Sequence, residues 1–90
     1  MKKYSLVLFV TGNSPRSERA VGNLVRMCDE ALSDDYELTI IDVLEQPDLA
    51  EEANILATPT LIKMMPNPVH RLFGDFSEPK KVMMELGLGG

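Results

Sequence analysis

The first pattern in the chain is a nearly continuous apolar run, Tyr4 to Val10, rich in residues that favour β-structure. Such a run is typical of a strand that is covered on both faces and therefore central in its sheet. Gly12 and Asn13 end the run. Ser14 is then a natural helix N-cap, and Pro15 suits the first helical position, where its missing N–H costs nothing. The pattern predicts a strand, a turn and a helix.

The predicted helix carries apolar residues at helical spacing, which form one stripe able to cover a sheet face. These residues are Ala20, Val21, Leu24, Val25, Cys28, Ala31 and Leu32. Ser33, Asp34 and Asp35 close the element. The helix therefore leads directly into the next β-rich segment.

Tyr36 to Val43 is the second predicted strand, and its alternation divides the side chains between two faces. One face is expected to carry Leu38, Ile40 and Val43, and the other Glu37, Thr39 and Ile41. A strand, a helix and a strand in this order favour a right-handed crossover between parallel strands.

The second half begins with a short predicted helix, Pro47 to Ala53, whose proline and acidic residues suit its first turns. Thr60 to Met65 and Val69 to Phe73 flank a Pro-Asn-Pro turn, which favours a hairpin. A last helix is predicted to be capped by Ser77 and to run to Leu86. The predicted order is βαβαββα, with the helices divided over the two sheet faces in one α/β sandwich.

Composition limits what the chain can be. Its 90 residues are enough for one domain, residues 1–90, and 44% hydrophobic with 26% charged residues is typical of a soluble globular protein. No apolar run is long enough to span a bilayer, so we expect a cytoplasmic protein with no membrane partner. A net charge of −5 without a basic run makes nucleic acid a poor partner.

The chain has one cysteine, Cys28, and one histidine, His70, which excludes an internal disulfide and a structural zinc site. Cys28 lies on the apolar stripe, away from any helix N-terminus that would lower its pKa, so we expect it to be buried and inert. No cofactor or metal is predicted.

The segment Ala57 to Leu61 resembles the strand entry at which thioredoxin-like domains place a cis proline beside their active site. On that resemblance Pro59 is expected to be cis. The position of the redox motif reads Thr11 to Arg16 and lacks Cys-x-x-Cys. Because no pair of residues reads as nucleophile and base, the chain is not expected to be an enzyme.

Two further features are candidates for binding a small ligand. The turn from Gly12 to Ser14 could hold an anion, but it lacks a P-loop lysine and is better explained as turn and N-cap. In glutathione-binding relatives of thioredoxin-like domains, the backbone at this strand entry pairs with a peptide-like ligand. The resemblance implies the same pairing for Thr58 and Thr60, although the chain lacks the thiol that such relatives use.

Surface charges supply the candidates for partner contacts. His70 and Arg71 are predicted near the sheet edge, where His70 is interpreted as solvated and Arg71 as an interface residue. The acids of the short helix could form a solvated face or a docking patch for a basic partner. They are Asp48, Glu51 and Glu52.

Three ordered segments together resemble the KaiB family of circadian clock proteins. They are Val10 to Pro15, Ile41 to Leu61 and Pro68 to Asp75. The resemblance implies a non-enzymatic component that binds the ATPase ring of the KaiC family and regulates its phosphorylation state and output. It also implies capture of KaiA or competition with a sensor histidine kinase bearing a similar domain.

Metamorphism is a further implication of the resemblance. KaiB proteins can hold a ground-state fold, βαββααβ, which shares the first βαβ unit and often assembles as a dimer or tetramer. Members often carry lysine at the positions of Thr39 and Asn54 and arginine at His70, whereas Arg19 and Arg71 keep the expected charge. Those surfaces are therefore expected to bind partners, with some contacts retuned.

The end of the chain bears on this balance, because glycines 87, 89 and 90 are poor strand formers. We therefore expect the thioredoxin-like state to be more accessible here than in longer relatives. Two other functions stay open: a thioredoxin-like adaptor in stress response or signalling, and a glutathione or thiol enzyme, for which the chain lacks a nucleophile.

Overall fold

The elements follow one another as the hydrophobic pattern predicts. A computed structural model describes residues 2–87. The elements are β1 (Tyr4–Val10), α1 (Pro15–Leu32), β2 (Tyr36–Asp42), α2 (Pro47–Glu52), β3 (Thr60–Met65), β4 (His70–Phe73) and α3 (Pro79–Glu85). This is the thioredoxin-like order βαβαββα and not the alternative βαββααβ. Glycines 89 and 90 lie outside the described residues.

The four strands form one sheet in the order β2-β1-β3-β4. β1 pairs parallel with β2, so that Leu6 lies opposite Leu38, and antiparallel with β3, so that Val7 lies opposite Ile62. β3 and β4 form the antiparallel hairpin, with Ile62 opposite Arg71. The predicted central place of β1, the parallel β1–β2 pair and the hairpin are confirmed.

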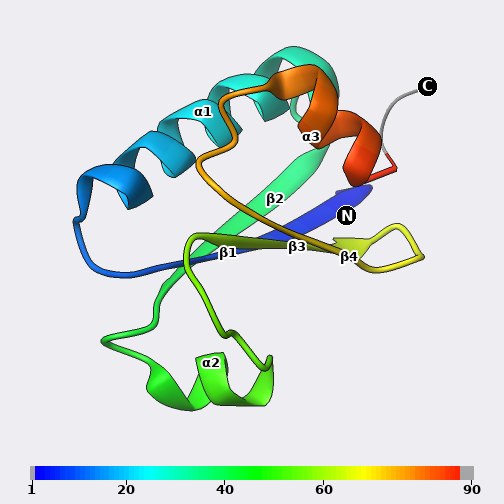
Figure 1. Ribbon diagram of the computed structural model, residues 1–90. Helices are drawn as coiled ribbons and strands as arrows, with labels where there is room; N and C mark the ends of the chain where they lie inside the picture. Colours follow the sequence, from blue (N-terminus) through cyan, green and yellow to red (C-terminus); the bar gives the residue numbers. More distant parts are fainter. Residues whose placement is uncertain (1, 88–90) are drawn as a thin grey trace.

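The helices divide over the two faces of the sheet, as predicted. Figure 1 shows α1 and α3 on one face and α2 alone on the other. The main core lies between the sheet and the α1/α3 layer. Its buried members are Leu6, Leu8, Val10, Ala20, Leu24, Met27, Cys28, Leu32, Leu61, Phe76, Val82 and Leu86.

The apolar stripe of α1 is mostly as predicted, with two corrections. Ala31 is exposed, whereas Met27 is buried in the core. Met27 takes this place because it lies three residues after Leu24, on the side of the helix that faces the sheet.

The second strand also departs from the prediction. β2 ends at Asp42, so Val43 does not share a strand face with Leu38. Ile40 is aligned with the core but stays 46% exposed, because β2 is an edge strand.

The predicted capping of α3 by Ser77 is wrong, because the N-cap of the helix is Glu78. Pro79 takes the first helical position, which moves the start of the helix one residue further along the chain. The Ser77 N–H instead donates to Asp75 Oδ1 at 3.2 Å. Asp75 therefore orders the turn before the helix rather than the helix itself.

Lys63 is a buried charge that the sequence pattern did not reveal. Its side chain is 2% exposed, and Nζ donates to the carbonyl oxygens of Pro66 at 2.7 Å and Pro68 at 2.9 Å. The bonds tie β3 to the turn that leads into β4. The Met65–Pro66 and Asn67–Pro68 peptide bonds in this turn are cis.

Tyr36 connects the start of β2 to α1, because its hydroxyl donates to Asp29 Oδ1 at 2.6 Å. This hydrogen bond is the main cause that raises the pKa of Tyr36 from 10.0 to about 12, with burial and nearby charges adding to it. The folded state thus favours the protonated phenol. The stabilisation is fully present below the unfolded pKa of about 10 and is lost as pH rises towards 12.

We therefore expect the free energy of unfolding to fall between about pH 10 and 12, and to fall less steeply in Tyr36→Phe. Urea unfolding at a series of pH values measures both slopes, with Tyr4→Phe as the matched control. The buried Cys28 thiol, whose pKa is raised to about 11, also lowers the free energy of unfolding as the pH rises. This contribution is the same in the unsubstituted chain, Tyr36→Phe and Tyr4→Phe, so it does not affect the comparison. Equal slopes for Tyr36→Phe and the unsubstituted chain would contradict the assignment.

Candidate functional site: the α2 face

The sheet face opposite α1 is covered by a helix of six residues, none of them buried. Figure 1 shows α2 lying over one end of this face. The surface beside the helix contains a hollow of about 390 Å³. It is lined by Val7, Phe9, Ile41, Leu49, Glu52, Ala53, Ile62, Met64, Val69 and Arg71. We call this surface, with the exposed side of α2, the α2 face.

Several large apolar side chains on this side of the molecule are open to solvent. Val69 is 52% exposed and Met64 43% exposed, and Phe73, two residues beyond Arg71 on β4, is 69% exposed. Met64 and Val69 line the same hollow, and exposed apolar side chains that adjoin one another mark interaction sites on soluble proteins. Val69 and Phe73 were not singled out from the sequence, although the alternation of the hairpin strands places Phe73 on the same side as Arg71.

The exposed side of α2 gives one border of this face a negative charge. Asp48, Glu51 and Glu52 are exposed and together line a shallow hollow. Because carboxylates at such close spacing repel one another, a basic partner surface would relieve their repulsion as well as pair with them.

Arg71 crosses from β4 to the end of α2. Its guanidinium donates to the carbonyl oxygens of Ala53 and Asn54. Asn54 follows the helix with a φ of +56°, a left-handed conformation that asparagine tolerates well. Arg71 thus neutralises the C-terminal end of α2 and fixes the helix against the hairpin.

Five of the six residues predicted to contact partners lie on the side of the sheet that carries α2. Thr39 is exposed on β2 directly opposite Val7, a residue of the hollow. The other four belong to α2, its C-terminal end and β4, namely Asp48, Glu51, Asn54 and Arg71. No pattern in the sequence shows that these separate segments share one face.

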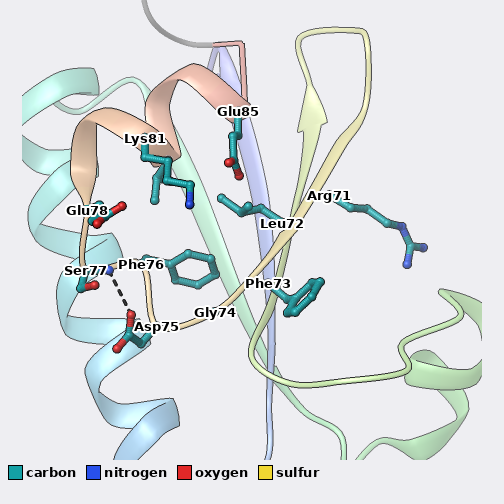
Figure 2. Close-up of a pocket in the computed structure, with 11 residues that line it drawn as sticks. Arg71, Leu72, Phe73, Gly74, Asp75, Phe76, Ser77, Glu78, Lys81 and Glu85 are labelled. Atoms are coloured by element: carbon teal, nitrogen blue, oxygen red, sulfur yellow. Dashed lines mark hydrogen bonds between the residues drawn. The ribbon is translucent and has the colours of Figure 1, made fainter.

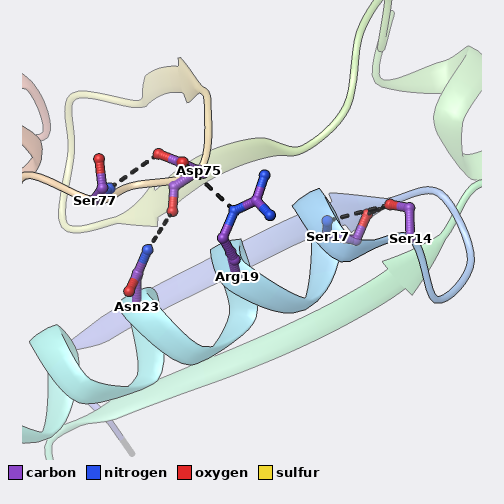
Figure 3. Close-up of polar contacts among 6 residues, drawn as sticks. All are labelled: Ser14, Ser17, Arg19, Asn23, Asp75 and Ser77. Carbon is purple, nitrogen blue, oxygen red and sulfur yellow. Dashed lines mark hydrogen bonds and ion pairs between the residues drawn. The ribbon is translucent and has the colours of Figure 1, made fainter.

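Arg19 lies apart from this group, on α1. Its Nε is 3.8 Å from Asp75 Oδ2, and on the same helix Asn23 Nδ2 donates to the Asp75 carbonyl oxygen at 2.8 Å. Figure 3 shows these side chains converging on the segment between β4 and α3. The structure therefore gives Arg19 an intramolecular contact and does not bring it to the α2 face.

The place of a thioredoxin active site is occupied by hydroxyl groups. Pro59 is buried and follows a cis peptide bond, as expected. The hydroxyls of Thr58 and Thr11 are hydrogen-bonded to each other. The Thr60 hydroxyl donates to the Ala57 carbonyl oxygen. The side chains that could face a ligand here are thus bonded within the chain.

The predicted turn at Gly12 and the helix start at Pro15 are also confirmed. Gly12 has a φ of +53°, and its N–H donates to Asp42 Oδ1 at 3.0 Å. Ser14 Oγ accepts from the Ser17 N–H at 3.2 Å, which caps α1. These contacts order the β1–α1 turn from within.

Cys28 is not placed for thiol chemistry. The residue is fully buried, and this burial is the main cause that raises the thiol pKa to about 11. A thiol that keeps its proton at neutral pH is a poor nucleophile. Across residues 2–87 no group of three or more histidine, cysteine or acidic side chains is arranged to hold a metal ion. The described helices include none long and apolar enough to cross a membrane.

Comparison with known proteins decides the family. Residues 7–88 match the KaiB domain. The chain belongs to the KaiB family. It is 50% identical over 88 residues to circadian clock protein KaiB3 of Synechocystis sp., covering 98% of this chain and 86% of the relative.

A second relative leads to the same assignment. The circadian clock oscillator protein KaiB of Prochlorococcus marinus subsp. pastoris is 49% identical over 87 residues, which cover 97% of this chain and 81% of that protein. The family resemblance of the three sequence segments is thereby confirmed, and the chain is a circadian clock component of the KaiB type.

Solved structures agree on the fold. The N-terminal domain of Synechococcus elongatus SasA is similar with a TM-score of 0.77 and 24% identity, over 99% of this chain and 88% of that one. Mitochondrial thioredoxin 3 of Saccharomyces cerevisiae is similar with a TM-score of 0.74 and 17% identity, over 97% and 79%. The KaiB-family chain therefore has a thioredoxin-like fold.

Proposed function

We propose that this KaiB-family chain is a non-enzymatic regulator that binds a KaiC-type ATPase ring through the α2 face. Binding there would change the phosphorylation state and output of the ring. The observation that carries the proposal is the exposed apolar surface of Met64 and Val69 beside the acidic side of α2. An apolar centre bordered by charge is the usual composition of a protein interface.

The residues around the apolar centre give the interface its specificity. Asp48 and Glu51 would pair with basic side chains of the partner, while Thr39 and Asn54 offer neutral hydrogen-bonding groups. Arg71 holds the end of α2 in place, so its main role would be to position the acidic side of that helix.

Competition with a sensor histidine kinase, or capture of KaiA, would follow from the same docking. Two domains of similar shape can compete for one surface of a partner, and the fold shared with the N-terminal domain of SasA supports such competition. The chain would also be able to pass into the second family fold and to self-associate there. Two packings of one sequence need differ by only a few kcal/mol.

The test is complex formation with the KaiC homologue of the same host. The protein and the ATPase are mixed with ATP and followed over hours by size-exclusion chromatography with light scattering. We expect a stoichiometric complex, and Val69→Glu should weaken it at least about 30-fold, because a charge would be buried in the apolar centre.

Met84→Glu is the matched control, since Met84 is 76% exposed but belongs to α3, on the opposite face. It should leave the complex unchanged. Equal weakening by both substitutions would reject the α2 face as the contact. No complex with ATP, ADP or neither would reject KaiC binding and favour a thioredoxin-like adaptor in stress response or signalling.

A further inference from the structure

A second surface lies at the edge of the hairpin that faces away from β1, and it adjoins the α2 face at Arg71. β4 is the last strand of the sheet formed by residues 2–87, with β3 on one side. An edge strand presents a row of unpaired backbone groups that another chain can pair with.

The hydrogen-bonding pattern indicates which backbone groups face outward. The N–H of Gly74, directly after β4, donates to the Pro59 carbonyl oxygen at 3.1 Å. Antiparallel strands alternate between residues that bond to the partner and residues that point away from it. Since Gly74 bonds toward the β3 side, the N–H and C=O groups of Arg71 and Phe73 point to the outside.

A groove of about 400 Å³ runs between this edge and α3. Its apolar lining includes Leu72 from the strand together with Phe76 and Val82, both of which are buried. Figure 2 shows the side chains of Lys81 and Glu85 extending from α3 toward Leu72 and Phe76. A strand added to β4 would therefore place every second side chain in this groove.

The charges of the groove favour a basic occupant. On α3 and its N-cap, Glu78 and Glu85 contribute two carboxylates to the groove against the ammonium of Lys81. The lining also includes Arg71, but its guanidinium is bonded to the carbonyl oxygens of Ala53 and Asn54 beyond the groove. Asp75 is engaged by Arg19 and by the Ser77 N–H. The whole chain carries a net charge of −5. A second copy would bring two such acidic edges together, whereas a basic segment would neutralise one.

We propose that β4 accepts an extended basic segment of another protein as an additional strand. Alternate lysine or arginine side chains lie in the groove, with their aliphatic stems on Leu72 and Val82 and their charged ends near Glu78 and Glu85. The intervening apolar side chains pack against Phe73, which is 69% exposed on the other side of the strand. The backbone of Arg71 and Phe73 supplies the pairing hydrogen bonds.

The probe is a blocked hexapeptide of alternating lysine and valine, titrated into the isotope-labelled protein and followed by NMR. We expect the largest shifts at the amides of Arg71 and Phe73. The same peptide with glutamate in place of lysine should not bind. Two further peptides carry N-methyl groups on alternate amides, one at the odd-numbered and the other at the even-numbered residues. Only one of these two sets of amides donates hydrogen bonds to β4, so only one of the two peptides should lose binding.

Two pairs of variants separate the backbone and charge contributions. Phe73→Pro removes an outward N–H and should abolish binding, whereas Phe73→Ala keeps that N–H and should weaken binding less. Glu85→Lys should weaken binding about fivefold to tenfold. Glu37→Lys makes the same change of charge on β2, the opposite edge strand of the sheet, and should not weaken binding. The NMR chemical shifts of each variant without peptide report whether its fold is retained.

Three results would overturn the proposal. The first is equal binding of the lysine and glutamate peptides, and the second is binding unaffected by either N-methylation pattern. The third is a concentration-dependent shift of the β4 amides without peptide, which would assign the edge to a second copy of this chain. Because no ATPase is present, failure here leaves the KaiC test unaffected.

Discussion

Leu24→Ala is expected to lower the free energy of unfolding by about 3 kcal/mol, within the range of buried leucine truncations. Leu24 is 0% exposed and lies on the side of α1 that faces the sheet. Alanine has a higher helix propensity than leucine, so the loss would come from packing and the cavity left behind rather than from the helix itself. Urea unfolding followed by circular dichroism measures the change.

Leu56→Ala is the matched control, because the same atoms are removed from a side chain that is 97% exposed. Its effect should stay within about 0.5 kcal/mol. If Leu24→Ala cost less than about 1 kcal/mol, the assignment of α1 as the main cover of the sheet would be contradicted.

Lys63→Met is expected to lower the free energy of unfolding by about 2 kcal/mol. Methionine keeps most of the buried stem but removes both hydrogen bonds from Nζ to the carbonyl oxygens of Pro66 and Pro68. These are bonds from a charged donor, which contribute more than neutral ones, and partial hydration of the exposed Pro68 limits the loss. Hydrogen exchange should also become faster in the β3–β4 hairpin.

Lys80→Met provides the comparison, since Lys80 is exposed on α3. It should change stability by no more than about 0.5 kcal/mol and leave exchange in the hairpin unchanged. A stability equal to that of the unsubstituted chain, with unchanged exchange, would show that the Lys63 bonds do not hold the turn.

The strands and helices were predictable where local pattern and local stereochemistry agree. Tyr4 to Val10 is a β-rich apolar run, and Ser14 followed by Pro15 is a helix start that needs no long-range contact. The predicted cap at Ser77 was wrong because either Ser77 or Glu78 could precede the first helical residue. Pro79 takes the first helical position, and this makes Glu78 the N-cap. Met27 was missed because methionine suits both core and surface positions.

The candidate site was less predictable, because it is assembled from segments far apart in the sequence. Asp48 and Arg71 were recognised as charged surface residues, but their common location on one side of the sheet depends on strand order and on the position of α2. Val69 and Phe73 looked like ordinary strand residues. Their exposure follows from the small size of α2, which leaves much of the face uncovered.

The sequence by itself determined the element order, the absence of a Cys-x-x-Cys motif and the family, since these depend on local periodicity, residue identity and ordered motifs. Tertiary structure decided the contacts of individual side chains. It bonded Arg19 to the Asp75 segment, placed Arg71 at the end of α2 and enclosed Lys63 beneath the hairpin turn. The physical reason is that burial and pairing depend on which faces meet across the sheet, and no local window of sequence contains that information.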